Sequence, residues 1–122
     1  MSRARKNLGD SGERVAAMFL EQRGYKILER NFRTRGGEID LVAEDVDGLA
    51  FVEVRTRREG AGAPEESLTP RKRARMIAMA VEYLSRHEEY AERAWRIDFV
   101  AIELEKNRKV KRVEVIKSAV EA

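Results

Sequence analysis

The chain has 122 residues, of which 43% are hydrophobic, so it is long enough for one domain with its own core (residues 1–122) and too short for two. The absence of cysteine and the single histidine exclude a disulfide framework, a thiolate metal site and a histidine-rich metal site. Charged residues make up 39% of the chain, but 25 basic against 22 acidic residues leave a net charge of only +3, so an acidic partner must be inferred from where the charges lie.

No apolar run approaches the ~20 residues that a membrane-spanning helix needs. The basic N-terminus is not followed by the apolar core of a signal peptide. We therefore expect a soluble, cytoplasmic protein without a membrane partner. The many charges are also typical of the surface ion-pair networks of thermophilic proteins, and this alternative stays open for most of them.

Residues 6–23 are predicted to form a helix that ends at Gly24, a favoured C-terminal cap. Apolar residues recur in this segment at helical spacing: Val15, Ala16, Phe19 and Leu20. Residues 25–33 are predicted to form a first strand. From Glu38 onward, apolar and polar residues alternate with the period of a strand. Asp47-Gly48 is a favoured hairpin turn, which predicts that the next strand returns beside this one.

Residues 58–68 have the composition of a flexible loop, and Thr69-Pro70 supplies an N-cap and a first residue for a second helix. The predicted buried stripe of this helix follows helical spacing: Ala74, Ile77, Ala78, Val81 and Leu84. Residues 95–104 and 110–116 are predicted to be strands, the second at a sheet edge. The order α-β-β-β-α-β-β indicates an α/β fold with a central mixed sheet of three to five strands flanked by helices.

The two-residue turn fixes the register of the first hairpin and pairs Asp40 with Arg55. Glu53 then lies on the diagonal, within ~7–8 Å of Asp40. Because paired residues share a face of the sheet, these three charged side chains are expected to project together from one face. The opposite face of the hairpin is apolar and is predicted to be core: Ile39, Leu41, Val52 and Val54.

Two carboxylates this close repel each other unless a cation lies between them. A hard divalent ion such as Mg²⁺ or Mn²⁺ suits carboxylate ligands, polarises a phosphodiester and lowers the pKa of a bound water. Arg55 would then neutralise charge that develops on the phosphate. The alternative is a solvated sheet face on which Asp40 pairs with Arg55 and Glu53 with another base.

Residues 37–43 (GEIDLVA) and 51–55 (FVEVR), separated by a short hairpin, resemble the D…ExK core of the PD-(D/E)XK nuclease superfamily. More closely, the chain resembles the YraN family (UPF0102) of small bacterial proteins over about residues 8–103. Further matching segments carry this resemblance: Gly12-Glu13, Gly24–Leu28, Asn31–Arg33 and Arg96–Ile102. It implies a restriction-endonuclease-like three-layer fold.

The resemblance also implies site residues. Asp40 and Glu53 become ligands of Mg²⁺ or Mn²⁺, with the carbonyl of Val54 as a third. Glu13 matches an extra acidic residue that many members of the superfamily place beside the metal. The alternative interpretation is that Glu13 is an exposed carboxylate near the N-terminus of its helix. Arg55 departs from the pattern, because the superfamily usually has lysine there. Arginine keeps the positive charge but does not release its proton, so Arg55 suits phosphate binding better than base catalysis.

Basic residues crowd the first turns of the second predicted helix: Arg71, Lys72, Arg73 and Arg75. Cations are unfavourable at a helix N-terminus, and a bound phosphate would relieve this conflict. The sequence therefore predicts one groove for nucleic acid, lined by residues of this helix and of the preceding strand end: Arg57, Arg58, Arg71, Lys72 and Arg75. The alternative is local neutralisation by nearby acidic residues: Glu65, Glu66 and Glu82.

The resulting functional prediction is a divalent-metal-dependent endonuclease that acts on DNA or RNA, branched forms included. The main alternative is a non-catalytic nucleic-acid-binding module on the same scaffold, which the arginine at position 55 favours. A protein-interaction domain whose charges serve only solubility is a weaker third option. The oligomeric state stays open, although a homodimer would suit an enzyme that cuts both strands of a duplex.

Overall fold

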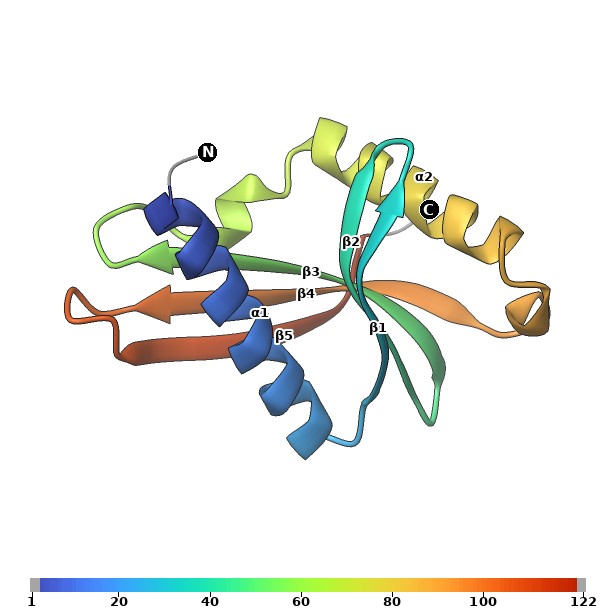
Figure 1. Ribbon diagram of the computed structural model, residues 1–122, viewed down its shortest axis with the longest axis horizontal. Helices are drawn as coiled ribbons and strands as arrows, with labels where there is room; N and C mark the ends of the chain where they lie inside the picture. The colour runs from blue at the N-terminus through green and yellow to red at the C-terminus, as the bar shows by residue number, and fades with distance from the viewer. Residues whose placement is uncertain (1–2, 121–122) are drawn as a thin grey trace.

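The computed structural model describes the backbone of residues 3–120 and the side chains of residues 11–120 (Figure 1). Two helices and five strands follow one another in the predicted order: α1 (Arg3–Gln22), β1 (Lys26–Thr34), β2 (Gly37–Asp45), β3 (Gly48–Arg58), α2 (Pro70–Ser85), β4 (Trp95–Leu104) and β5 (Val110–Val120). The loop before α2 contains a 3-10 turn, Pro64–Ser67, and a second turn, Glu88–Tyr90, follows that helix. The predicted α/β class is therefore confirmed.

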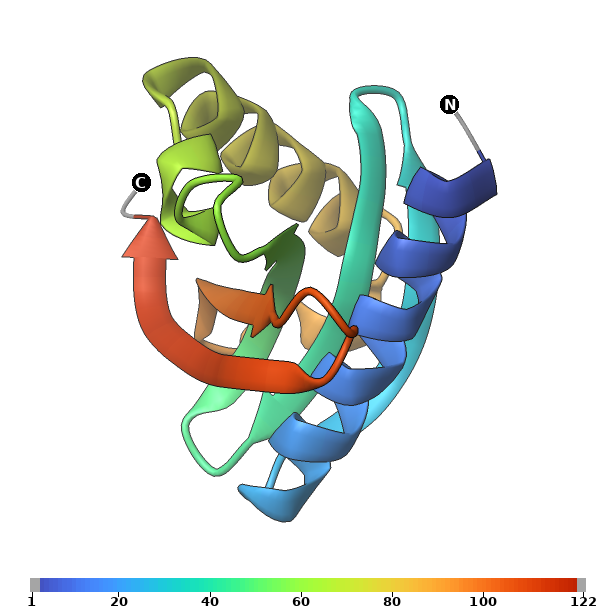
Figure 2. The same cartoon turned by 90° about the vertical axis from the view of Figure 1, so that its left-hand side faces the viewer.

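The five strands form one mixed sheet in the spatial order β1-β2-β3-β4-β5, with β5 at an edge as predicted. All neighbours are antiparallel except β3 and β4, which are parallel and are joined by the crossover that contains α2. The two helices cover opposite faces of the sheet, which gives three layers (Figure 2). No helix in the described part of the chain is long and apolar enough to span a membrane.

The core under α1 consists of small and branched side chains. Ala16, Ala17 and Leu20 of α1 are fully buried, which confirms the predicted helix face. They pack against residues of β2, β3 and β4: Leu41, Ala43, Ala50, Val52, Val100 and Ile102. The predicted cap is also confirmed, since Gly24 adopts a φ of +91° and the next N–H donates to the Leu20 carbonyl at 3.0 Å.

The buried stripe of α2 differs from the prediction. Its buried residues are Met76, Met79, Ala80 and Tyr83, whereas three residues of the predicted stripe face solvent: Ala74, Ala78 and Val81. Both sets recur at helical spacing, so periodicity could not choose between them. The larger methionine and tyrosine side chains remove more apolar area from water when they pack on Ile39, Phe51 and Ile97.

The hairpin between β2 and β3 turns one residue earlier than predicted. Its two-residue loop is Val46-Asp47, and Asp45 pairs with Gly48. The Asp45 carboxylate accepts a hydrogen bond from the Asp47 N–H at 2.9 Å, which stabilises this loop as an Asx turn. Every cross-strand pair therefore moves by two residues along β3.

The predicted pairing of Asp40 with Arg55 is wrong for this reason, and β2 also separates from β3 at Asp40. The pairing of the two strands ends at Leu41 and Val52. Beyond this point β2 turns away with β1, while β3 continues beside β4 (Figure 1). Ile39 lies in the core under α2 although Leu41 lies under α1, so the predicted grouping of these two residues on one face is also wrong.

Gly48 provides a test of the hairpin geometry. It adopts a φ of +138°, and a Cβ added there would lie 2.3 Å from the carbonyl oxygen of Ala94. We predict that Gly48→Ala lowers the free energy of unfolding by about 2–3 kcal/mol in urea titrations, through backbone strain and this clash. Gly36→Ala is the control, because its added Cβ would make only ordinary contacts, at 3.6 Å from Arg75 Cγ. Equal losses in both variants would contradict the assigned hairpin.

Candidate metal centre and nucleic-acid surface

The separation of β2 from β3 places Asp40 beside the backbone of β3. Oδ2 of Asp40 accepts a hydrogen bond from the N–H of Val54 at 2.8 Å, where a paired strand would offer a backbone carbonyl. Because the N–H and C=O of one strand residue point to the same side, the Val54 carbonyl is directed into the same gap. The structure thus brings together the side chains of Asp40 and Glu53 and the carbonyl of Val54.

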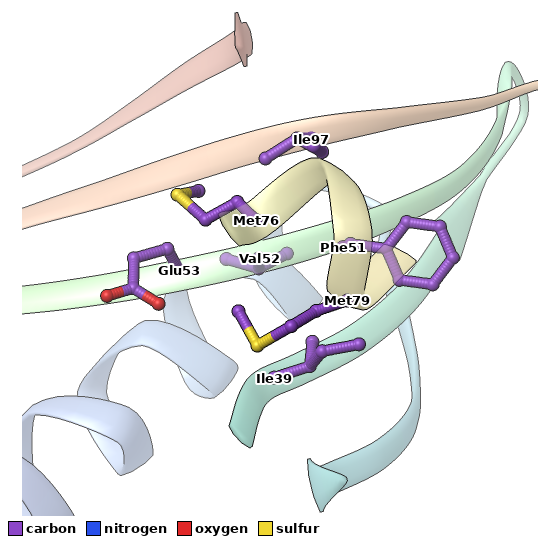
Figure 3. A pocket seen from close by; sticks show the side chains of 7 residues that line it. All are labelled: Ile39, Phe51, Val52, Glu53, Met76, Met79 and Ile97. Carbon is purple, nitrogen blue, oxygen red and sulfur yellow. The ribbon is translucent and has the colours of Figure 1, made fainter. Parts of the chain in front are cut away.

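Glu53 is almost enclosed, with its side chain 8% exposed. Apolar side chains from α2 and β2 wall it on one side, among them Met76, Met79 and Ile39 (Figure 3). The cavity between them measures about 10 Å³, which leaves room for one water at most. A ligand of any size must therefore approach Glu53 from the side of Asp40 rather than through this apolar wall.

Two basic residues contact the Glu53 carboxylate, and the nearer one was not expected there. Nζ of Lys72, on α2, lies 2.8 Å from Oε2 of Glu53. The guanidinium of Arg55 reaches the same oxygen at 3.5 Å, the limit of a hydrogen bond. Lys72 was predicted on the outer, nucleic-acid-binding face of its helix, but its side chain is 14% exposed and is directed into the acidic site.

Glu13 reaches the neighbourhood of Asp40 from α1. One of its carboxylate oxygens accepts a hydrogen bond from Nδ2 of Asn31 at 2.7 Å, and its negative charge contributes to raising the pKa of Asp40. The part of the chain that the structure describes contains no group of three acidic or histidine side chains close enough to hold a metal ion. Glu13 therefore adds negative charge, while the candidate ligands are two carboxylates and one carbonyl.

Asp40 is held in an unusual electrostatic state. Burial and, next in size, the charge of Glu53 raise its pKa to about 8, against the opposing effects of the Val54 N–H and of Lys72. The protonated form of this carboxyl is therefore favoured at neutral pH. Two carboxylates and a carbonyl are the hard oxygen donors that Mg²⁺ and Mn²⁺ prefer, so the residues present fit such an ion.

The buried carboxylate of Asp98 differs from that of Asp40 in the partners that it has. Asp98 is fully buried but accepts hydrogen bonds from Arg96 Nε at 3.0 Å, from the Tyr25 hydroxyl at 2.9 Å and from the Ser118 N–H at 2.9 Å. Asp98 thus has a basic partner, Arg96, on its own strand. Arg96 also binds Asp45 and holds the pKa of that carboxyl well below its usual range. Asp98 is thus neutralised within the chain, whereas Asp40 is not.

Arg55 has a donor that the protein leaves unused. Its Nε is buried and, among the described residues, has no hydrogen-bond partner. Of the alternative interpretation, the pair of Arg55 with Asp40 is not formed, because Asp40 binds the Val54 N–H and Arg55 lies nearest Glu53. The other half, a pair of Glu53 with another base, is formed by Lys72. Arg57 is half-buried and Arg58 is exposed further along β3.

The basic residues of α2 divide into two groups. Lys72 is directed inward, whereas Arg71, Arg73 and Arg75 are exposed. The acidic residues of the alternative interpretation bind other partners: Glu65 pairs with Arg112, Glu66 accepts the Ala63 N–H, and Glu82 pairs with Arg86. Arg35 is a further basic residue, which the sequence did not single out for this surface. It is exposed in the turn between β1 and β2, next to Gly36, where an added Cβ would lie 3.6 Å from Arg75 Cγ.

The pKa of Asp40 predicts how stability depends on pH. The folded chain retains a proton on Asp40 between pH values of about 4 and 8, where the unfolded chain has released it, so wild-type stability should fall as the pH rises through this window. Asn cannot ionise and can still accept the Val54 N–H. We predict that Asp40→Asn, in EDTA, melts several degrees above wild type at pH 9, and that this advantage largely disappears at pH 4.5. An advantage that did not change with pH would contradict the assigned state of Asp40.

The comparison with known proteins covers nearly the whole chain. The sequence profile of the Uncharacterised protein family UPF0102 matches residues 12–102. A UPF0102 protein of Roseiflexus castenholzii is 46% identical over 99% of this chain and 98% of its own length. UPF0102 proteins of Dehalococcoides mccartyi and Moorella thermoacetica are 43% and 44% identical, each over 98% of this chain and over 97% and 99% of their own lengths. The chain therefore belongs to the UPF0102 family, as its sequence motifs indicated.

Proposed function

We propose that this protein binds nucleic acid and hydrolyses phosphodiester bonds with one divalent ion, Mg²⁺ or Mn²⁺, held by Asp40, Glu53 and the Val54 carbonyl. The observation that carries the proposal is the state of Asp40, whose pKa is raised to about 8 by burial and by the neighbouring Glu53. Two carboxylates at a partly buried site repel each other, and the single nearby contact from Lys72 falls on Glu53 rather than on Asp40. Raised pKa values of this kind are concentrated at functional sites.

The chain's own residues have distinct tasks in this proposal. The Val54 N–H fixes the Asp40 carboxylate, and Lys72 fixes that of Glu53. A bound divalent ion supplies Lewis-acid polarisation of the phosphodiester and a water of lowered pKa. The Arg55 side chain is 35% exposed, so its guanidinium is available to a phosphate oxygen, whose geometry a planar guanidinium suits. Arg55 thus acts on the phosphate, whereas the carboxylates act on the metal.

The arginines around this site support a nucleic-acid substrate. Arg71 and Arg75 are exposed on α2, and at the end of β3 Arg58 is exposed and Arg57 half-buried. Contacts of this kind to phosphates orient the substrate without reading its sequence. We therefore propose DNA or RNA, bound largely independently of sequence, with branched forms among the candidates.

The second candidate function is a non-catalytic nucleic-acid-binding module. The arginine at position 55 favours it, because arginine does not serve as a base at accessible pH. Single-turnover assays with Mn²⁺ on single-stranded, duplex and branched substrates separate the two functions. Cleavage that Glu53→Gln abolishes supports the endonuclease, whereas binding without cleavage on all three substrates supports the module.

The proposed metal site predicts the response of Mn²⁺ binding to substitution. Calorimetric titration of wild type should give one site. Asp40→Asn should weaken it at least tenfold, because one of two charged ligands is lost. Asp47→Asn is the control, since that carboxylate lies in the exposed loop of the β2–β3 hairpin. Unchanged affinity in Asp40→Asn would show that the metal site is misassigned.

The proposed surface predicts a salt dependence. Each phosphate that a basic side chain contacts contributes about 0.7–0.9 to the slope of log K against log salt. Arg71→Gln combined with Arg75→Gln should therefore reduce that slope by about 1.4–1.8. The control combines Arg23→Gln, just after α1, with Lys26→Gln, at the start of β1; both residues are exposed, and the double change removes the same charge. Equal slopes in both double variants would remove α2 from the nucleic-acid surface.

A further inference from the structure

We infer that Lys72 is the positioning residue of the metal centre: its ammonium group fixes the Glu53 carboxylate and supplies the permanent positive charge of the site from α2 rather than from β3. This inference rests on the proposed function and adds a residue to it. It reassigns Lys72 from the outer basic surface to the acidic pair.

The contact itself distinguishes Lys72 from Arg55. Lys72 Nζ lies 2.8 Å from Glu53 Oε2, within strong hydrogen-bond distance, whereas the Arg55 guanidinium lies at 3.5 Å. The Lys72 side chain is 14% exposed and that of Arg55 35% exposed, so the lysine contact is the better shielded from solvent. Lys72 is therefore the principal cation on Glu53.

The position of Lys72 on α2 explains how it reaches the site. Thr69 caps the helix by accepting the Lys72 N–H at 3.2 Å, which places Lys72 in the first turn. It lies four and seven residues before Met76 and Met79, so it extends the buried stripe by one turn toward the helix N-terminus. A cation is unfavourable at this end of a helix unless an anion faces it. Glu53 is that anion.

Both basic side chains contact the same oxygen of the Glu53 carboxylate, Oε2. The other oxygen, Oε1, is left to coordinate a metal ion. The charge of Lys72 extends to Asp40 as well, whose pKa it lowers. Lys72 therefore partly neutralises both carboxylates when no metal is bound. Once a divalent ion is bound, the same ammonium repels it while it continues to hold Glu53.

This arrangement predicts opposite effects on metal affinity and on reaction rate. Lys72→Gln removes the repulsion between two cations, so Mn²⁺ should bind several-fold more tightly than to wild type in calorimetric titrations. Single-turnover cleavage at saturating Mn²⁺ should fall about 10²-fold, because Glu53 loses its orientation and the site its fixed charge. Lys72→Arg should recover at least a tenth of the wild-type rate. A purely structural role would weaken metal binding and cleavage together.

Lys111→Gln is the matched control, because this lysine also pairs with a glutamate, Glu59, but on the exposed surface of β5. It should leave Mn²⁺ affinity and cleavage unchanged. Lys72→Met keeps the apolar stem of the side chain and replaces Lys72→Gln if the buried amide prevents folding. It should show the same tighter Mn²⁺ binding and slower cleavage as expected for Lys72→Gln.

The outcomes separate this inference from the proposed function. Wild-type rate and wild-type Mn²⁺ affinity in Lys72→Gln and Lys72→Met would overturn the role of Lys72 and leave the endonuclease intact. If wild type cleaves none of the substrates, the proposed hydrolysis fails, and the Mn²⁺ titration alone decides about Lys72. Tighter binding then supports its place beside the metal, and unchanged binding overturns it.

Discussion

The hydrogen bond from the Val54 N–H to the Asp40 carboxylate is the interaction on which the candidate site depends. It forms only because β2 leaves β3 after Leu41, so that a side chain replaces the backbone carbonyl of a continuing ladder. The same separation leaves the Val54 carbonyl without a ladder partner on β2, while the hairpin register, continued by one residue, keeps Glu53 opposite Asp40. Without it, the two strands would continue as an ordinary hairpin and the carboxylates would lie on a closed sheet face.

The two helices complete this gap from opposite sides of the sheet. α1 packs closely through Ala16 and Ala17 and brings Glu13 near Asp40, while α2 packs through its methionines and brings Lys72 onto Glu53. The core on each face thereby sets the distance between groups that the sequence places far apart. Stability and site geometry thus have the same origin, since the residues that anchor each helix also orient its charged group.

The basic partners of the acidic side chains distinguish Asp40 from Asp98 and Asp45. Elsewhere in the sheet, Arg96 neutralises Asp45 and Asp98 through contacts of 2.8 and 3.0 Å, so the fold is able to satisfy buried carboxylates. At Asp40 it does not: burial and the charge of Glu53 raise the pKa of this carboxyl despite the nearby Lys72. Buried groups left in such a state cost stability, and their retention is typical of sites at which a ligand restores the balance.

Much of this arrangement was predictable from local sequence. The helical period of α1, the Thr69-Pro70 start of α2 and the alternation in β2 and β3 gave the correct elements and brought Asp40 and Glu53 together. The hairpin register was not predictable, because a hydrogen bond from the Asp47 N–H to the Asp45 carboxylate favours the earlier loop. The inward direction of Lys72 was not predictable either. The sequence of α2 contains two sets of apolar residues at helical spacing, and only packing on the sheet selects the set with Met76, Met79 and Tyr83. A basic residue in phase with those methionines was the available signal.

An anomalous-scattering map from crystals grown with Mn²⁺ would locate the proposed metal ion directly. We predict one peak in the gap between β2 and β3, within direct coordination distance of Asp40, Glu53 and the Val54 carbonyl. Lys72 should still contact Glu53. The same map for Asp40→Asn should lack that peak. A wild-type map with no peak in this gap, at a Mn²⁺ concentration that saturates binding in solution, would contradict the account.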